Sequence, residues 1–315
     1  MTNQRNKLKI NREAVFSETP PFPVNMLVEL ANICNHKCIF CNYQNMKREK
    51  RICDKEFTKK IIQEAYSEGV REIGFYLIGE PFVYKELEEI ILFCKKTGFS
   101  YIYITTNGAL ATPNRLKAVI DAGLDSIKFS INAASRESYE KIHGKDDFLT
   151  VKDNLVWLRS YLDASKIPLK TFISFVECNY NKDEVCLLHE QFDNLVDKVY
   201  VFGCANQGGN MMHLVESGIA QELVPRAAPC PMVFNRLHIT AEGFLDACCA
   251  DSDGLLVVAD LHTMSLKDAW YSDTMIDLRR QHLKKSFGNN LCRNCIQNID
   301  SSIDPLRVIK PIKNT

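Results

Sequence analysis

The sequence predicts an α/β fold, because short β-rich runs alternate with stretches of helical spacing through the middle of the chain. Six β-rich runs are expected, at residues 24–31, 72–78, 101–106, 126–131, 170–176 and 198–202. The helical stretches lie between them, at residues 58–67, 85–96, 113–122, 150–161 and 183–192. Such repetition makes consecutive strands parallel, with the helices as crossovers. Six repeats are fewer than the eight of a closed barrel, so periodicity alone leaves a partial barrel and a doubly wound sheet open.

Capping residues mark the ends of three of these helices. Thr112 before Pro113 is typical of a helix start, because proline at the first helical position needs no hydrogen-bond donor. Gly69, Gly98 and Gly123 each follow a helical stretch, where glycine readily adopts the left-handed conformation that ends a helix. Residue type therefore supports the boundaries that the spacing predicts.

The composition is that of an ordinary globular chain without net charge. Of 315 residues, 46% are hydrophobic and 25% are charged, with 39 Lys and Arg against 39 Asp and Glu. This excludes a disordered or collagen-like protein, and the lack of a basic excess argues against nucleic-acid binding. No apolar run approaches the ~18 residues that span a bilayer, and the polar first residues lack the apolar centre of a signal peptide. We therefore expect a soluble, cytoplasmic protein with no nucleic-acid or membrane partner.

Thirteen cysteines, an odd number, are the unusual feature of this sequence. In a reducing compartment, cysteines are more often metal ligands or catalytic groups than disulfides. Most of them lie in groups toward the two ends of the chain: Cys34, Cys38, Cys41, Cys230, Cys248, Cys249, Cys292 and Cys295. The others stand singly and are expected in the core: Cys53, Cys94, Cys178, Cys186 and Cys204. This grouping predicts two metal centres.

The first group, Cys34-x-x-x-Cys38-x-x-Cys41, directly follows the first predicted strand. Structural zinc prefers four ligands, usually as two separated pairs, and His36 is the nearest residue that could supply a fourth. Three thiolates instead suit a [4Fe–4S] cluster with one iron left open to an exogenous ligand. The spacing thus favours an iron–sulfur cluster over zinc.

These residues, with Phe40 before the third cysteine, resemble the signature of the radical S-adenosylmethionine (radical SAM) superfamily. Further motifs occur in the family's order at strand ends: Gly79–Glu80–Pro81, Thr106–Asn107–Gly108, and Ser130–Ile131–Asn132. Ile78 replaces the first glycine of the family's Gly-Gly-Glu element. The resemblance implies a partial (β/α)6 TIM-like barrel, a [4Fe–4S] cluster on Cys34, Cys38 and Cys41, and S-adenosylmethionine (SAM) as cofactor. It also implies that SAM is bound by Phe40, Gly79, Glu80, Pro81, Asn107, Ser130 and Asn132.

After residue 206 the strand–helix rhythm ends. A hairpin is expected over residues 236–248, then one helix over 265–284, then a C-x-x-C loop beyond that helix. Cys230, Cys248, Cys292 and Cys295 form a four-thiolate set that could ligate zinc or an iron–sulfur cluster. The arrangement resembles the SPASM/twitch auxiliary-cluster domains, which implies a second [4Fe–4S] cluster.

Residues 296–315 contain no further cysteine, so a single-cluster twitch module is the better match. We therefore expect an N-terminal extension (1–23), a radical SAM core barrel (24–210), an auxiliary-cluster domain (211–299) and a C-terminal tail (300–315).

Cys249 is left over beside the second set. It is either a bystander or a hydrogen-atom donor to a substrate radical, because a thiol S–H bond is weak. Polar residues at the expected rim suggest a hydroxyl- and amine-bearing small-molecule substrate: Glu177, Asn179, Cys204, Asn206, Gln207, Asn210 and His213.

The resemblance extends to aminocyclitol dehydrogenases, in which the auxiliary cluster accepts the second electron. Where that pattern has Asn-Arg-Gly-Gly, this chain has Gln207, which is no useful base near pH 7. We therefore predict redox-neutral epimerisation of a sugar- or aminocyclitol-like molecule, with Cys249 as the catalytic residue and dehydrogenation as the alternative. A peptide-modifying maturase is a further alternative, although the 23 residues before the first strand are few for leader recognition. A reductant such as flavodoxin or ferredoxin is the expected partner.

Overall fold

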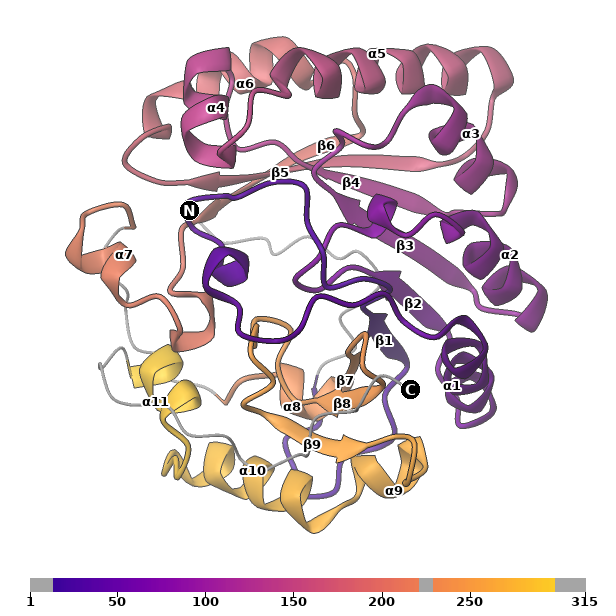
Figure 1. The fold of residues 1–315 in the computed structure, drawn as a ribbon, viewed down its shortest axis with the longest axis vertical. Coiled ribbons are helices and arrows are strands. Elements are labelled where there is room, and N and C mark those ends of the chain that lie inside the picture. The colour runs from indigo at the N-terminus through magenta and orange to yellow at the C-terminus, as the bar shows by residue number, and fades with distance from the viewer. Residues whose placement is uncertain (1–13, 221–228, 298–315) are drawn as a thin grey trace.

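One curved sheet forms the centre of the molecule (Figure 1). The computed structural model describes residues 14–220 and 229–297. Its nine strands lie in the order β6-β5-β4-β3-β2-β1-β7-β8-β9. The first six pair in parallel and are β1 (Asn25–Val28), β2 (Glu72–Phe75), β3 (Tyr101–Thr106), β4 (Ser126–Ser130), β5 (Lys170–Glu177) and β6 (Lys198–Gly203). The consecutive parallel order confirms the predicted α/β fold and corresponds to six barrel strands.

Six helices connect these strands and lie along the outside of the sheet (Figure 1). They are α1 (Lys55–Ser67), α2 (Leu87–Thr97), α3 (Pro113–Asp121), α4 (Arg136–His143), α5 (Phe148–Ser165) and α6 (Val185–Phe192). Five were predicted, and α4 was not. This helix has only eight residues, of which Tyr139 and Ile142 alone are apolar, so the sequence offers few apolar positions from which to predict it. Ser135 caps it by accepting a hydrogen bond from the backbone N–H of Ser138.

The two faces of the barrel sheet differ in chemistry because successive side chains on a strand point in opposite directions. Outward-facing residues pack with the helices in the main core, among them Ile73, Phe75, Ile104, Ile127 and Phe129. Each such buried side chain stabilises the fold by roughly 1.5–3 kcal/mol. The alternate residues face inward and include polar and charged side chains. The helices thus hold the sheet from outside and leave the inner face for chemistry.

The C-terminal module extends the same sheet beyond β1. Strand β7 (Arg236–Ile239) pairs in parallel with β1, and β8 (Phe244–Asp246) and β9 (Val257–Asp260) continue antiparallel. The predicted hairpin is confirmed, with shorter strands than expected. Its turn includes Gly243, whose φ of +84° favours glycine.

Two predictions in this module are wrong. The single helix expected over 265–284 is divided into α9 (Leu266–Trp270) and α10 (Asp273–Lys284). The break occurs because the Ser272 side chain accepts from the N–H of Met275 and starts a new helix. The expected C-x-x-C loop is instead part of α11 (Asn290–Gln297). Its N–H groups at the start are capped in part by Asn289, whose side chain accepts from the N–H of Cys292 at 2.8 Å.

Shorter helices complete the described chain, namely α7 (His213–Glu216) and α8 (Met232–Asn235). Four 3-10 helices also occur, η1 (Asn42–Asn45), η2 (Pro81–Val83), η3 (Lys182–Glu184) and η4 (Gln207–Gly209). No helix in residues 14–220 or 229–297 has the length and apolarity to cross a membrane. Most of the N-terminal extension and all of the predicted tail (300–315) lie outside the described residues. Of the single cysteines, Cys186 is exposed on α6, so its predicted place in the core is wrong.

Candidate functional site

The first thiol set lies on the loop that leaves β1, at the carboxyl edge of the parallel strands, where such folds bind ligands. The loop turns back on itself, and the N–H of Cys41 donates to the carbonyl of Cys38 at 3.0 Å. Burial, with smaller contributions from the neighbouring Glu80 and Cys41, raises the pKa of Cys34 to about 12. The pKa of Cys38 is raised by burial and by both other thiols.

Burial raises the pKa of all three thiols, so a cationic metal cluster that stabilises the thiolates suits this donor set. His36, the possible fourth ligand, is turned to Asp147, with Nε2 and Oδ2 2.9 Å apart. The donor set therefore fits a three-thiolate iron–sulfur cluster.

Steric contacts require a glycine at position 79. A Cβ at this position would lie 1.9 Å from the carbonyl oxygen of Ala31, and backbone atoms cannot yield that far. The N–H of Glu80 donates to the carbonyl of Ile33 at 2.9 Å. Gly79 thus allows the end of β2 to lie directly against the start of the thiol loop.

Glu80 is buried and receives three hydrogen bonds. Its carboxylate accepts from Thr106 Oγ1 at 2.6 Å, from the N–H of Asn107 at 2.8 Å and from the N–H of Phe82 at 3.1 Å. Burial raises the pKa of Glu80 to about 7 despite these donors. Pro81 follows as the first residue of η2. Glu80 therefore ties the ends of β2 and β3 together.

The other predicted SAM contacts lie at the same edge. Asn107 Nδ2 is 3.8 Å from Cys34 Sγ and 2.8 Å from Asn35 Oδ1. Ser130 Oγ is 3.4 Å from Ser174 Oγ on β5. Asn132 Oδ1 accepts from the N–H of Val176 at 2.8 Å. The structure thus places these side chains at successive strand ends around the first thiol set.

Phe40 lies apart from the other predicted SAM contacts. It packs in a small separate core with Cys178, Cys204, Met211 and Leu214. This core joins the thiol loop to the segments that follow β5 and β6.

The second thiol set is assembled from three distant segments of the chain. The pKa of Cys248 is raised by burial and then by Cys249 and Cys230. The pKa of Cys292 is raised by burial and by the thiols of Cys230 and Cys295. The four predicted ligands therefore lie near one another, and this cysteine-rich donor set fits a metal centre. Gly208 lies against it, since a Cβ there would be 3.7 Å from Cys248 Sγ.

Cys249 lies between the second set and the barrel. Together with Cys248 it lines a small cavity whose other walls include Leu77 and Ile78, directly before the Gly79 motif. Burial raises the pKa of the Cys249 thiol, while the nearby Arg236 guanidinium lowers it. The Cys249 thiol thus lies beside the second thiol set and near the residues that precede the Gly79 motif.

Two cations on the inner face of the sheet were not predicted. Lys128 on β4 lies with Nζ 5.7 Å from the ring centre of Tyr76. Burial lowers the pKa of Lys128, and the nearby Arg236 guanidinium lowers it as well. Neither Lys128 nor Arg236 takes part in an ion pair within the described ranges. Lys128 lies between the apolar Ile127 and Phe129, and this alternation is the sequence signal that could have placed it on the inner face.

A buried charge network joins the barrel to the C-terminal module and was also not predicted. Arg48 contacts Glu29 and Glu242 at 2.9 Å each, and its Nε donates to the carbonyl of Ser252 at 2.8 Å. The side chain of Glu29 is 1% exposed, on the segment that follows β1. The signal in the sequence is a glutamate within the first apolar run.

Several predicted rim residues have structural hydrogen bonds. Asn206 accepts from the N–H of Gly209 at 3.2 Å and donates to the carbonyl of Asn294 at 3.2 Å. Asn179 donates to the carbonyl of Gly218. Gly209 leaves no room for a Cβ against the backbone of α11, 2.6 Å from the carbonyl of Leu291. This loop therefore fixes α11, with its two cysteines, to the barrel rim.

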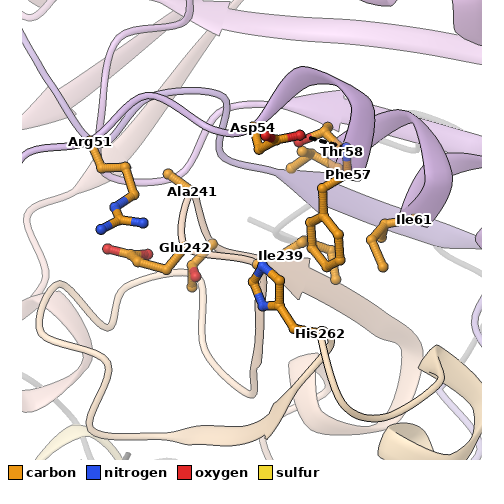
Figure 2. A pocket seen from close by; sticks show the side chains of 12 residues that line it. Arg51, Asp54, Phe57, Thr58, Ile61, Ile239, Ala241, Glu242 and His262 are labelled. Atoms are coloured by element: carbon orange, nitrogen blue, oxygen red, sulfur yellow. Dashed lines mark hydrogen bonds between the residues drawn. The ribbon is translucent and has the colours of Figure 1, made fainter. Parts of the chain in front are cut away.

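A second cavity lies between the start of α1 and the turn from β7 to β8 (Figure 2). In Figure 2 the Phe57 and His262 rings face each other, and their centroids are 4.0 Å apart at an interplanar angle of 5°. Arg51, Asp54 and Glu242 add charges to its wall. None of its lining residues is a cysteine, so it is separate from both thiol sets.

A partial barrel with three clustered thiols at its carboxyl edge and a second thiol centre beside it defines an iron–sulfur enzyme. Comparison with known families agrees: the radical SAM superfamily model matches residues 28–185, and the SPASM iron–sulfur cluster-binding domain matches residues 230–296. The chain belongs to the radical SAM superfamily and carries a SPASM-type domain. The family brings a [4Fe–4S] cluster and SAM to the barrel, and the second domain brings further iron–sulfur binding.

Three individual proteins similar to this chain are each 30% identical to it or less over the matched residues. A "Probable GTP 3′,8-cyclase" of Saccharolobus islandicus is 30% identical over 192 residues, which cover 61% of this chain and 56% of the relative. The match thus spans little more than half the length of that relative.

Two solved structures share the fold. BtrN in complex with AdoMet and 2-DOIA has a TM-score of 0.61 and 20% identity, covering 86% of this chain and 92% of BtrN. Streptococcus suis SuiB bound to precursor peptide SuiA has a TM-score of 0.66 and 17% identity, covering 87% of this chain and 70% of SuiB. These likenesses confirm the predicted barrel with its second module.

Proposed function

We propose that this radical SAM enzyme epimerises a polar small molecule bound against the inner face of the barrel, with Cys249 as the hydrogen-atom donor. The observation that carries this proposal is the position of Cys249. The Arg236 guanidinium on β7 lowers the pKa of the Cys249 thiol. Cys249 also lines a small cavity with Leu77 and Ile78, which precede the Gly79 motif. As hydrogen-atom donor, Cys249 would act on the face of the substrate opposite the one from which hydrogen is removed.

The proposal includes an assignment of the cluster ligands and the SAM contacts. We assign the barrel cluster to Cys34, Cys38 and Cys41, and the second cluster to Cys230, Cys248, Cys292 and Cys295. SAM would contact the strand-end residues Phe40, Gly79, Glu80, Pro81, Asn107, Ser130 and Asn132. When bound, the cluster and SAM supply a 5′-deoxyadenosyl radical that removes hydrogen from an unactivated C–H bond. The corresponding division is a core barrel over 24–210 and an auxiliary-cluster domain over 211–299.

Cys249 would then close the cycle. Its S–H bond breaks and a C–H bond forms at the substrate radical, which inverts that carbon and leaves a cysteine thiyl radical. One electron and one proton restore the thiol. Each turnover therefore uses one SAM and two electrons in all, supplied by a reductant of the flavodoxin or ferredoxin class.

The charge of the inner face of the sheet indicates which substrates could bind there. Lys128 and Arg236 place two positive charges beside tyrosine side chains, with no ion pair to either cation in the described chain. A cationic amine would be repelled there, whereas hydroxyl, carboxylate or phosphate oxygens would accept their hydrogen bonds. We therefore favour an oxygen-rich, sugar-like substrate over the amine-bearing one expected from the rim residues.

Dehydrogenation is the second candidate, because Cys249 directly follows Cys248 and the inner face thus lies close to the second thiol set. An electron from a substrate radical would then have a short path to that cluster. The fold likeness to BtrN and to SuiB does not select between small-molecule and peptide substrates.

Product mass separates these candidates. The anaerobically reconstituted enzyme, supplied with SAM and a reductant, is incubated with a panel of sugar-like compounds, sugar phosphates, aminocyclitols and peptides. Epimerisation yields a product of unchanged mass with inverted configuration. A product two mass units lighter would replace the epimerase proposal with the dehydrogenase.

A further inference from the structure

We propose that His143, at the end of α4, is a positioning residue that couples the cluster loop to the SAM-binding end of β4. Its Nδ1 donates a hydrogen bond to Cys38 Sγ, and its Nε2 accepts one from the backbone of Asn132. This inference rests on the proposed role of Cys38 as a cluster ligand and adds a control of that cluster by the protein.

The hydrogen bonds of the ring determine its tautomer. The N–H of Asn132 points at His143 Nε2 over 3.3 Å, and a backbone N–H can only donate. Nε2 therefore carries a lone pair, which leaves the ring proton on Nδ1. Nδ1 lies 3.6 Å from Cys38 Sγ, within the range of an N–H···S hydrogen bond. Both ring nitrogens are thus used, one on each partner.

The end of α4 holds the cluster loop in place through backbone contacts as well. The N–H groups of Lys37 and Ile39 donate to the carbonyls of His143 and Ile142, both at 2.9 Å. These carbonyls have no partner within the helix, because the last four of any α-helix do not. The loop thus caps α4, and α4 in turn fixes the two residues on either side of Cys38.

Close packing keeps the histidine ring in this orientation. The Tyr139 ring stacks on it with centroids 4.0 Å apart and an interplanar angle of 11°. Gly144 ends the helix at a φ of +67°, and a Cβ there would lie 2.9 Å from the carbonyl oxygen of Lys37. The ring therefore has little freedom to turn away from Cys38.

An N–H donated to a ligand sulfur withdraws charge from it and favours the reduced cluster, so it raises the reduction potential. The same ring holds Asn132, which the family resemblance assigns to SAM. Loss of the ring nitrogens should therefore make the cluster harder to reduce and weaken its response to SAM together.

A mononuclear metal site is the competing explanation. One ligand atom each from His36, Cys38 and His143 lie within 4.8 Å of one another. Cys38 would then be lost to the barrel cluster, and a metal such as zinc would replace the N–H···S bond.

The test uses the reconstituted holoenzyme with His143→Phe, which keeps a flat ring against Tyr139 but removes both nitrogens. Tyr139→Phe is the matched control, because the Tyr139 hydroxyl is buried without a partner in the described structure. The readouts are the midpoint potential of the SAM-responsive EPR signal, the SAM concentration that produces half of the response, and the iron and zinc content.

We expect His143→Phe to retain its iron, to show a more negative potential and to need roughly two- to tenfold more SAM, as for one lost hydrogen bond. Tyr139→Phe should match the wild type. His143→Asn, whose amide can still donate toward Cys38, should restore the potential more than the SAM response. If the Phe variant does not assemble, the same comparison is made between His143→Asn and His143→Gln.

Wild-type potential and SAM response in His143→Phe would overturn the inference, as would one zinc per chain that disappears in this variant. A wild-type enzyme that forms no SAM-responsive cluster would instead overturn the proposed ligand set, and this inference with it.

Discussion

The two thiol sets of this protein are built in opposite ways. The first lies within eight residues of one loop, and its supports are the end of α4 and the ends of β2 and β3. The second takes its thiols from the segments before β7, after β8 and within α11. A local set depends on a few nearby contacts, whereas a dispersed set forms only when distant segments are docked. The two sets should therefore respond differently to damage.

The first set should show the largest effect. Replacing Cys34, Cys38 and Cys41 together by Ala removes every proposed ligand of the barrel cluster. We expect about half of the iron to be lost and 5′-deoxyadenosine formation to fall to background, measured by iron assay and chromatography. SAM cleavage at the wild-type rate would contradict the assignment.

Loss of the second thiol set should leave the barrel cluster in place. Replacing Cys230, Cys248, Cys292 and Cys295 by Ala should leave about four of about eight irons per chain. Uncoupled SAM cleavage should persist, because the ligands and SAM contacts of the barrel remain. A stoichiometric zinc in the wild type, with only about four irons, would show that the second centre is a structural zinc site.

Arg48 tests whether the two regions are linked through the buried charge network. Arg48→Met leaves Glu29 without its cation, and breaking a buried ion pair in this way costs about 3–5 kcal/mol of unfolding free energy. Lys59→Met is the control, because Lys59 pairs with the largely exposed Glu56 and such pairs contribute about 0–1 kcal/mol. Denaturant unfolding of the two variants should differ accordingly. Equal midpoints would show that Arg48 does not join the modules.

Glu80 should give the smallest effect, visible as a pH dependence of the protein without cofactors. Burial raises its pKa from 4.5 to about 7 in the folded chain, so folding favours the protonated form. Its contribution to stability is therefore fully present below about pH 4.5 and is lost as the pH rises through about 7. Glu80→Gln should flatten the decline in unfolding free energy between pH 5 and 8. An unchanged slope would contradict the raised pKa.

The contrast between the two sets also explains how far the sequence could predict the site. Cys34, Cys38 and Cys41 are recognisable because a local set leaves a fixed spacing. The strand-end motifs are recognisable because parallel strands bring their carboxyl ends to one edge. His143 and Arg48 could not be found in this way, since their roles depend on contacts between segments far apart in the chain. For Lys128, the alternation on β4 gives the face of the sheet but not the neighbouring Arg236.

Local competition explains the wrong secondary-structure predictions. Ser272 can cap a new helix as well as continue an old one, so residues 265–284 are divided despite a continuous apolar period. The C-x-x-C pair is predicted as a loop just beyond a helix, but the Asn289 cap and the close approach of Gly209 accompany a helix at this segment.

Turnover in D2O tests whether Cys249 donates the hydrogen atom, because the S–H proton of Cys249 exchanges with solvent. We expect one deuterium at the inverted carbon of the product. Cys249→Ala should still cleave SAM but deliver no inverted product, while Cys186→Ala, which changes an exposed thiol on α6, should behave as the wild type. A product without deuterium, formed equally well by Cys249→Ala, would contradict the account.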